Sequence, residues 1–263
     1  MTLTKPTVVF IPGAWLGQQT YNDFISFLEE SSFPTKYISY PSLNPSNNAI
    51  TDAAADTESI LENAFLPLIE AEGKDVVVIM HSYGGVPGSA AAKGLGKHTR
   101  SREGKRGGVI GLIHISGFVL PQGMSVADGQ GGDLPEWVIQ NEPSTGLTMP
   151  HDPMNTLSAD IDPAAAKASA SNLLPHALLA FKSPAPAPAW TEPGWEGRLA
   201  YLVCTEDRAI PKAGQEAMVQ GTGMTWLMKE MNGSHNYPFL KEPGKTCSIV
   251  EGLAEEFLKI EIH

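Results

Sequence analysis

The sequence predicts an α/β fold: a mostly parallel sheet of about six strands, helices on both faces and a helical cap insertion. Short runs of β-branched and apolar residues alternate with segments of helical spacing, an order typical of parallel strands joined by crossover helices. One long segment between two of these runs has no apolar strand pattern. A chain of 263 residues, 42% of them hydrophobic, is large enough for such a domain with an insertion.

The apolar runs locate the strands, and the segments between them locate the helices. Strands are expected at residues 7–11, 36–40, 76–81, 109–115, 199–204 and 225–228. Helices are expected at residues 21–28, from about 52 to 72, directly after Ser82, at 212–220 and at 243–260. His114 falls within one of the strands and is interpreted as a hydrogen-bonded core histidine.

Residues 122–193 are the predicted insertion. Glycines and prolines there separate short helical pieces around residues 137–139, 163–171 and 173–181. The proline-rich stretch 183–188 is interpreted as a stiff, extended return to the sheet. We therefore expect a core made of residues 1–121 and 194–263, and a mainly helical cap made of residues 122–193.

The composition indicates which classes of partner and which cellular compartment are expected for this protein. The formal charge of −11 argues against nucleic acid as the main partner. No run approaches the ~20 apolar residues that span a bilayer, and the N-terminal residues have no signal-peptide pattern. Cys204 and Cys247 fit buried thiols in a reducing compartment. We expect a cytoplasmic protein with a small-molecule substrate and no membrane or nucleic-acid partner, and the sequence leaves a homodimer open.

Residues 93–106 are glycine-rich and basic, with six Lys or Arg side chains. Such a stretch is either an anion or partner site or a solvated surface loop. Glu103 and the glycines leave it without amphipathic order, which favours the solvated loop.

Ser82 ends the most apolar run of the chain and precedes Gly84 and Gly85. A strand, a tight turn and a small-residue helix of this kind can hold a serine hydroxyl clear of the backbone, as a nucleophile elbow does. Met80 stands where the usual G-x-S-x-G pattern has its first glycine. The alternative is that Ser82 is only a helix N-cap.

Two further polar residues follow later strands, at the edge where open parallel sheets bind ligands. Asp207 comes after residues 199–204, and His235 comes after residues 225–228. Alone, Asp207 could be a turn residue and His235 a surface-loop histidine. Together with Ser82 they have the order nucleophile, acid, base, in which histidine takes the serine proton and the carboxylate orients the imidazole. The backbone N–H groups of Ala14 and Tyr83 are the expected oxyanion-hole donors.

These motifs resemble the α/β-hydrolase superfamily, in particular the small-esterase branch that includes plant methyl-ester esterases and hydroxynitrile lyases. The resemblance covers nearly the whole chain: residues 12–15 resemble the oxyanion loop, residues 81–85 the nucleophile elbow, and Ser234-His235 the catalytic histidine. It places the acid at Asp207, the head of an Asp-basic-x-Ile-Pro motif, and not at Glu206. Pro12 departs from the family, which has histidine there.

The resemblance implies hydrolysis of a carboxylic ester, lactone or thioester of a small, fairly apolar substrate, with no metal or organic cofactor. The related lyases have a lysine directly after the catalytic histidine, where this chain has Asn236, so hydrolysis is favoured. A lyase or cyclase using the same triad, or a ligand receptor, are the alternatives. The expected substrate-binding residues are Trp15, Trp137, His176 and Phe181, with His151 a further candidate for the wall of the site.

Overall fold

Six parallel strands form the central sheet of the computed structural model, which describes residues 5–260. Their order across the sheet is β2-β1-β3-β4-β8-β9, with β3 in the middle between β1 and β4. The strands are β1 (Thr7–Ile11), β2 (Thr35–Tyr37), β3 (Asp75–His81), β4 (Gly108–Ile115), β8 (Leu199–Cys204) and β9 (Leu227–Met231). The predicted fold class is confirmed.

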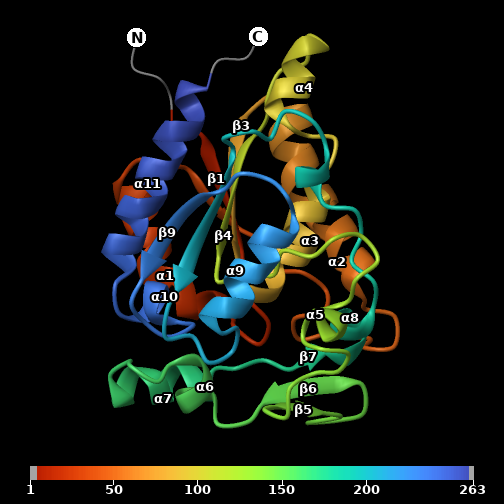
Figure 1. Cartoon of the computed structure of the whole chain (residues 1–263), viewed down its shortest axis with the longest axis vertical. Helices are drawn as coiled ribbons and strands as arrows, with labels where there is room; N and C mark the ends of the chain where they lie inside the picture. The colour runs from red at the N-terminus through yellow and green to blue at the C-terminus, as the bar shows by residue number, and fades with distance from the viewer. Residues whose placement is uncertain (1–4, 261–263) are drawn as a thin grey trace.

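Helices cover both faces of this sheet (Figure 1). One face packs against α1 (Asn22–Glu30), α10 (Tyr237–Leu240) and α11 (Pro243–Lys259). The other packs against α2 (Ala53–Ile60), η2 (Leu61–Ala71), α3 (Gly85–Ala91) and α9 (Lys212–Gly221). Each inner strand is therefore buried on both faces, which explains why its sequence is a continuous apolar run.

The helix predicted over residues 52–72 forms as two joined parts. α2 is an α-helix whose N-cap, Asp52, accepts a hydrogen bond from the Ala55 N–H at 2.8 Å. The continuation, η2, is a π-helix and contains Pro67. Proline lacks an N–H and clashes with the carbonyl four residues earlier, and the wider π-helical turn accommodates it.

The two edge strands differ from their predicted bounds. β2 ends at Tyr37 instead of residue 40, before Pro41. β9 begins at Leu227 and runs to Met231, whereas the prediction stopped at residue 228. The central residues of β9 are exposed at this edge and include Lys229 and Glu230, so the strand does not read as an apolar run.

Residues 93–106 were predicted to be a solvated loop, but they include a helix, α4 (Lys97–Arg102). Arg100 in this helix is only 2% exposed. Its guanidinium donates to the carbonyls of Gly107 (3.0 Å) and Arg106 (3.1 Å) and pairs with Glu70 of η2. This buried arginine connects the residues just before β4 to η2. The number of basic residues in the sequence does not reveal such a structural role.

His114 on β4 is buried, as predicted, but the predicted hydrogen bond is wrong: neither ring nitrogen has a hydrogen-bond partner within residues 5–260. Its ring stacks on Tyr201, with the centroids 6.2 Å apart. Burial lowers the pKa of His114 to about 3, so the ring is neutral and packs as an aromatic core residue.

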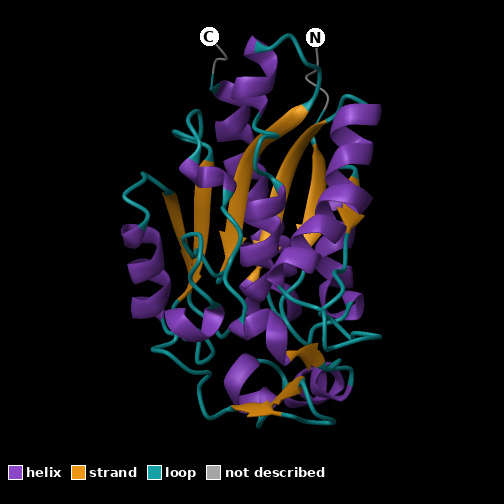
Figure 2. Ribbon diagram, turned by 90° about the vertical axis from the view of Figure 1, so that its right-hand side faces the viewer, coloured by secondary structure: helices purple, strands orange, loops and turns teal. Residues whose placement is uncertain are grey.

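Most of the segment 122–193, between β4 and β8, lies across the carboxyl ends of the sheet strands, and its last residues run back along the side of the sheet, where Glu192 accepts a hydrogen bond from the Gly94 N–H (Figures 1 and 2). It is less helical than predicted. A three-stranded antiparallel sheet in the order β5-β6-β7 accompanies its helices. Its elements are α5 (Val126–Gly129), β5 (Val138–Gln140), β6 (Leu147–Pro150), α6 (Pro153–Leu157), α7 (Pro163–Ser171), β7 (His176–Ala177), α8 (Leu178–Lys182) and the short η4 (Ala189–Thr191). Strands of two to four residues are too short for a readable alternation of apolar and polar positions.

Candidate active site

Ser82 stands at the turn between β3 and α3. It opens the short helix η3 (Ser82–Gly84), and its backbone has φ of 51°, in the left-handed region that residues with a side chain rarely adopt. The preceding residue, His81, is still extended, so the chain reverses its direction at the serine itself. Backbone strain of this kind clusters at functional sites because it fixes a side chain in one position.

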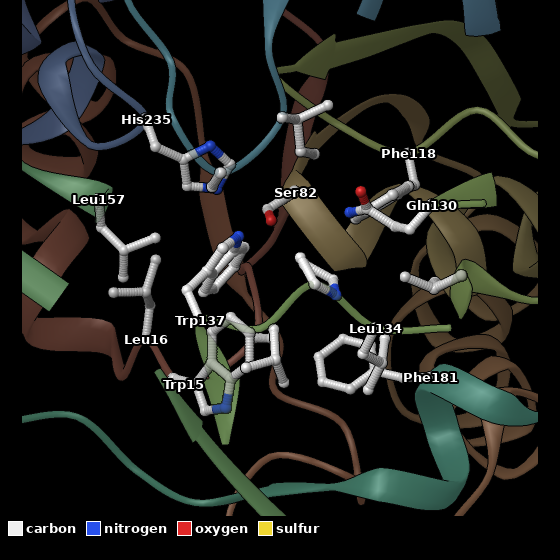
Figure 3. A pocket seen from close by; sticks show the side chains of 16 residues that line it. Trp15, Leu16, Ser82, Phe118, Gln130, Leu134, Trp137, Leu157, Phe181 and His235 are labelled. Atoms are coloured by element: carbon white, nitrogen blue, oxygen red, sulfur yellow. The ribbon is translucent and has the colours of Figure 1, made fainter. Parts of the chain in front are cut away.

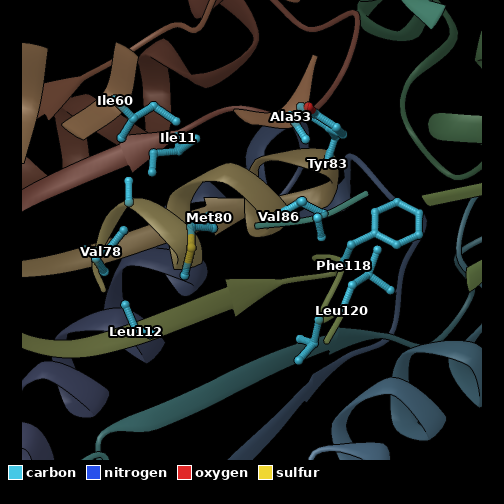
Figure 4. Close-up of a cluster of buried hydrophobic side chains, with 14 of the residues drawn as sticks. Ile11, Ala53, Ile60, Val78, Met80, Tyr83, Val86, Leu112, Phe118 and Leu120 are labelled. Atoms are coloured by element: carbon cyan, nitrogen blue, oxygen red, sulfur yellow. The ribbon is translucent and has the colours of Figure 1, made fainter. Parts of the chain in front are cut away.

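Small residues on the adjoining helix allow this sharp turn. A side chain at Gly84 would place its Cβ 2.4 Å from the Pro12 carbonyl oxygen, so only glycine fits. Met80, which replaces the usual elbow glycine, points into the core (Figure 4). Room for it comes from Gly88 on α3, where a Cβ would lie 2.9 Å from Met80. Gly88 thus compensates for the glycine that the motif lacks at position 80.

His235 and Asp207 form a buried pair. The His235 Nδ1 lies 2.6 Å from Asp207 Oδ2, and both side chains are almost completely shielded from solvent. A carboxylate at this distance makes Nδ1 the protonated nitrogen, which leaves Nε2 able to accept a proton. His81 packs beside His235 with ring centroids 4.6 Å apart. Burial, and then the neighbouring His235, hold the pKa of His81 well below its usual range, so His81 is neutral.

The loop after β8 fixes the Asp207 carboxylate. Its Oδ1 accepts hydrogen bonds from the N–H groups of Ala209 (2.8 Å) and Ile210 (2.9 Å), which leaves Oδ2 for His235. Gln215 of α9 is fully buried and holds the loop through hydrogen bonds to Cys204 and Ile210. Its role was not predicted, since a glutamine in an amphipathic helix has no distinguishing sequence signal.

The loop that carries His235 is docked on the segment 122–193. The N–H and hydroxyl groups of Ser234 both donate to the Asp160 carboxylate. On the other side of the histidine, the Asn236 N–H donates to the Leu157 carbonyl at 2.9 Å. The position of the imidazole therefore depends on contacts with residues 157–160 as well as on Asp207.

Two tyrosines hold the loop after β1. The Gly13 N–H donates to the Tyr21 hydroxyl at 3.0 Å, and that hydroxyl lies 2.9 Å from His81 Nδ1. The Tyr40 hydroxyl donates to the Pro12 carbonyl at 3.2 Å. These contacts supply side-chain support to a loop in which Pro12 itself has no polar side-chain group. The next residue, Ala14, faces the site.

A narrow cavity lies between the carboxyl ends of the strands and the segment 122–193. Figure 3 shows the Ser82 hydroxyl and the His235 ring on its wall, facing the same space. The rest of the wall is largely apolar: Ala14, Trp15, Leu16, Phe118, Val126, Gln130, Leu134, Pro135, Trp137, Val138, Leu157, Phe181, Ala209 and Ile210. The described lining includes no Asp, Glu, Lys or Arg.

Three of the four residues predicted to bind substrate, Trp15, Trp137 and Phe181, line this cavity. His176 does not. It is fully buried behind them, stacked on Phe181 with centroids 4.5 Å apart, and its Nε2 lies 2.9 Å from the Ser42 hydroxyl. His151 is exposed and also lies outside the lining. Both histidines are corrections to the predicted site.

A buried polar network, not predicted from the sequence, lies behind the elbow. Asp56 of α2 is fully buried and accepts hydrogen bonds from the Tyr83 hydroxyl (2.7 Å), the Ser42 N–H (2.8 Å) and the Ser42 hydroxyl (2.5 Å). Ser42 in turn contacts His176. The Tyr83 side chain therefore points away from the cavity, while its backbone directly follows Ser82.

The described part of the chain has no group of three or more His, Cys, Asp or Glu side chains that could hold a metal ion. Among its helices, none is long and apolar enough to cross a membrane.

Residues 8–248 match the model of the alpha/beta hydrolase family, and the chain belongs to that family. A relative from Aspergillus novofumigatus, described as alpha/beta hydrolase nvfD, is 28% identical over 262 residues, which cover 98% of this chain and 100% of the relative.

Solved structures share the fold. The pyrethroid hydrolase PytH has a TM-score of 0.72 at 16% identity, covering 97% of this chain and 99% of PytH. The methylesterase MES16 from Arabidopsis has a TM-score of 0.69 at 14% identity, covering 95% of this chain and 99% of MES16. The prediction of an α/β-hydrolase is confirmed at the level of the family and the fold.

Proposed function

We propose that the protein is a serine esterase that cleaves a carboxylic ester, lactone or thioester of a small, uncharged, largely apolar substrate. The observation that carries the proposal is the buried His235–Asp207 pair, 2.6 Å apart, whose His235 ring lines the same cavity as the strained Ser82. Membership of the alpha/beta hydrolase family supports the same chemistry.

Each residue has a defined step in the proposed reaction. The Ser82 hydroxyl oxygen attacks the acyl carbon while His235 Nε2 takes the hydroxyl proton. Asp207 stabilises the imidazolium that forms. The backbone N–H groups of Ala14 and Tyr83 stabilise the oxyanion. The proton then passes to the departing alcohol or thiol, and the acyl-enzyme is hydrolysed by water, which His235 deprotonates in turn.

The cavity wall supports the proposed substrate class. Trp15, Trp137 and Phe181 offer flat apolar surfaces beside Ser82 (Figure 3), and the described lining has no side chain that could pair with a charged substrate group. The names of PytH and MES16 describe those proteins as a pyrethroid hydrolase and a methylesterase. We extend to this chain only the cleavage of an ester.

We also propose that residues 122–193 act as a cap on a core of residues 1–121 and 194–263. The support is positional: this segment supplies Val126, Leu134, Trp137, Leu157 and Phe181 to the cavity wall. The core supplies Ser82, Asp207 and His235. Substrate choice should therefore depend on the cap, and bond cleavage on the core.

Covalent labelling with a fluorophosphonate tests the function, because this reagent reacts with an activated serine hydroxyl. We expect one adduct, located on Ser82 by peptide mass spectrometry, and no adduct in Ser82→Ala. Ser89, a fully buried serine on α3, provides the matched control as Ser89→Ala, which should label like the parent protein. Labelling that persists in Ser82→Ala would refute Ser82 as the nucleophile.

A further inference from the structure

Among the described side chains that line the cavity, Gln130 is the only one with an amide group. Ser82 and His235 on the same wall already have a role in the proposed reaction. Figure 3 shows its amide group directed toward Ser82, beside the ring of Phe118. The residue is half-buried, and no hydrogen bond joins its side chain to another residue within the described range 5–260. Its amide is therefore available to a bound molecule.

The backbone that carries Gln130 is held in place. α5 begins with a capping box, in which the Ser125 hydroxyl accepts from the Asp128 N–H at 3.0 Å and the Asp128 carboxylate accepts from the Ser125 N–H at 2.9 Å. The Gln130 N–H closes the helix by donating to the carbonyls of Val126 and Ala127, both at 3.1 Å. These contacts fix the backbone from which the Gln130 side chain extends.

The same stretch is tied to the extended return of the segment. The Gly123 N–H donates to the Ala185 carbonyl at 2.9 Å, and the Ala185 N–H donates to the Met124 carbonyl at 3.0 Å. α5 also packs against α8, which carries Phe181 of the cavity wall. Gln130 and Phe181 are thus parts of one supported wall.

Burying an amide against an apolar ligand without a hydrogen-bond partner is unfavourable. We propose that Gln130 recognises a second, uncharged polar group on the substrate, so that the substrate is a neutral, largely apolar ester that also bears a ketone or hydroxyl oxygen. The amide can donate to a carbonyl oxygen or accept from a hydroxyl, and it offers no charge to a carboxylate or an amine. This inference deepens the proposed function and rests on it.

Two methyl esters of matched size test the inference: methyl 3-oxo-3-phenylpropanoate, which has the ketone, and methyl 3-phenylpropanoate, which lacks it. Replacing Gln130 by Leu keeps the approximate side-chain size and removes the amide. We expect Gln130→Leu to lower kcat/KM for the keto ester about tenfold, on the scale of one neutral hydrogen bond, and to change the plain ester less than about twofold. The two esters differ in intrinsic reactivity. This difference cancels when the ratio of their kcat/KM values is compared between the parent protein and the variant.

Two other variants serve as controls. Gln122→Leu changes an exposed glutamine of the same segment outside the cavity, and it should leave the ratio unaltered. Gln130→Met also removes the amide and keeps an unbranched side chain of similar length, so it repeats the test if the leucine variant does not fold. An equal effect of the Gln130 variants on both esters would overturn the inference.

Binding to Ser82→Ala, followed by tryptophan fluorescence, separates this inference from the proposed function. The expected result is tighter binding of the keto ester, with the preference lost in Ser82→Ala/Gln130→Leu. If the parent protein hydrolyses neither ester but this preference persists, the esterase proposal fails and the role of Gln130 stands. If neither ester binds, the proposed substrate class and the inference both fall.

Discussion

Adjacent acidic residues at the end of β8 differ in burial, and this difference determines which of them can orient His235. Asp207 is 5% exposed and contacts His235, whereas the neighbouring Glu206 is exposed. Glu206 lies in the turn that follows β8 and faces solvent, whereas Asp207, directly after the turn, faces the imidazole. The shorter aspartate also receives two backbone N–H groups, which fix its orientation.

Asp207→Asn should lower kcat on a p-nitrophenyl ester by about 10⁴, because an amide at this position favours the wrong histidine tautomer. Glu206→Gln should lower kcat less than about tenfold, the scale of a modest electrostatic change of about 1 kcal/mol. Steady-state kinetics on both variants provide the measurement, with thermal melts to verify folding. The reverse ranking of the two effects would assign the acid to Glu206.

Residues with a local sequence signature were the ones that could be predicted. Ser82 and Asp207 follow strands that are readable from their apolar runs, His235 follows the less apolar edge strand β9, and the order of the three along the chain adds specificity. His176 was misjudged because nothing local distinguishes a histidine that faces a cavity from one that contacts Ser42 in the core. Gln130 was missed for the same reason, since its position on the cavity wall depends on how the chain folds.

At the scale of structural elements, the loop after β1 is supported by the helix that follows it. Tyr21 ends the short helix η1 (Gln18–Tyr21) immediately before α1, and its hydroxyl serves both the Gly13 N–H and His81. The loop and the strand before Ser82 are therefore coupled through one oxygen atom. Removing the Tyr21 hydroxyl leaves the Gly13 N–H and His81 Nδ1, both buried, without this hydrogen-bond partner.

We expect Tyr21→Phe to lower kcat about tenfold with little change in KM, because Ala14 loses its fixed position for the oxyanion, and to reduce the free energy of unfolding by about 1–3 kcal/mol. Kinetics and urea denaturation measure the two effects. Tyr37→Phe is the matched control, since its ring lies 6.3 Å from that of Tyr21 and its hydroxyl makes no hydrogen bond within the described residues. If both variants have the kinetics of the parent protein, Tyr21 does not support the loop.

Elements were predictable where burial on two faces produced a long apolar run, as in β1, β3, β4 and β8. The small sheet of β5, β6 and β7 was not, because its strands are short and are stabilised by pairing between segments far apart in the sequence. α4 escaped detection because the burial of Arg100 depends on Glu70 and on two carbonyls of a following turn.

At the scale of the whole molecule, Asp56 connects parts of the chain that are distant in sequence. It lies on α2 and receives hydrogen bonds from Tyr83 of the elbow and from Ser42, which contacts His176 of β7. Burial raises the pKa of Asp56 to about 6, while the hydrogen bonds from Ser42 and Tyr83 oppose this shift. The folded state therefore binds the Asp56 proton more tightly than the unfolded state, where the ordinary value is 3.8.

This difference makes the stability of the protein depend on pH. The contribution of Asp56 is fully present below about pH 4, where the group is protonated in both states, and it is lost as the pH rises from 4 to 6. The difference between a pKa of 3.8 in the unfolded state and about 6 in the folded state corresponds to about 3 kcal/mol. Asp56→Asn stays neutral throughout, so the unfolding free energy of the variant should gain about 3 kcal/mol relative to the parent between pH 4 and pH 7.

Urea denaturation at a series of pH values, carried out on both proteins, gives this difference directly. Burial lowers the pKa of His176 to about 3, but its titration is common to both proteins and cancels in the comparison. Glu58→Gln removes an exposed carboxylate from the same helix and should leave the difference from the parent constant with pH. Parallel stability curves for Asp56→Asn and the parent would mean that the three hydrogen bonds to Asp56 offset the cost of its burial, so that the carboxylate remains ionised in the folded protein down to about pH 4.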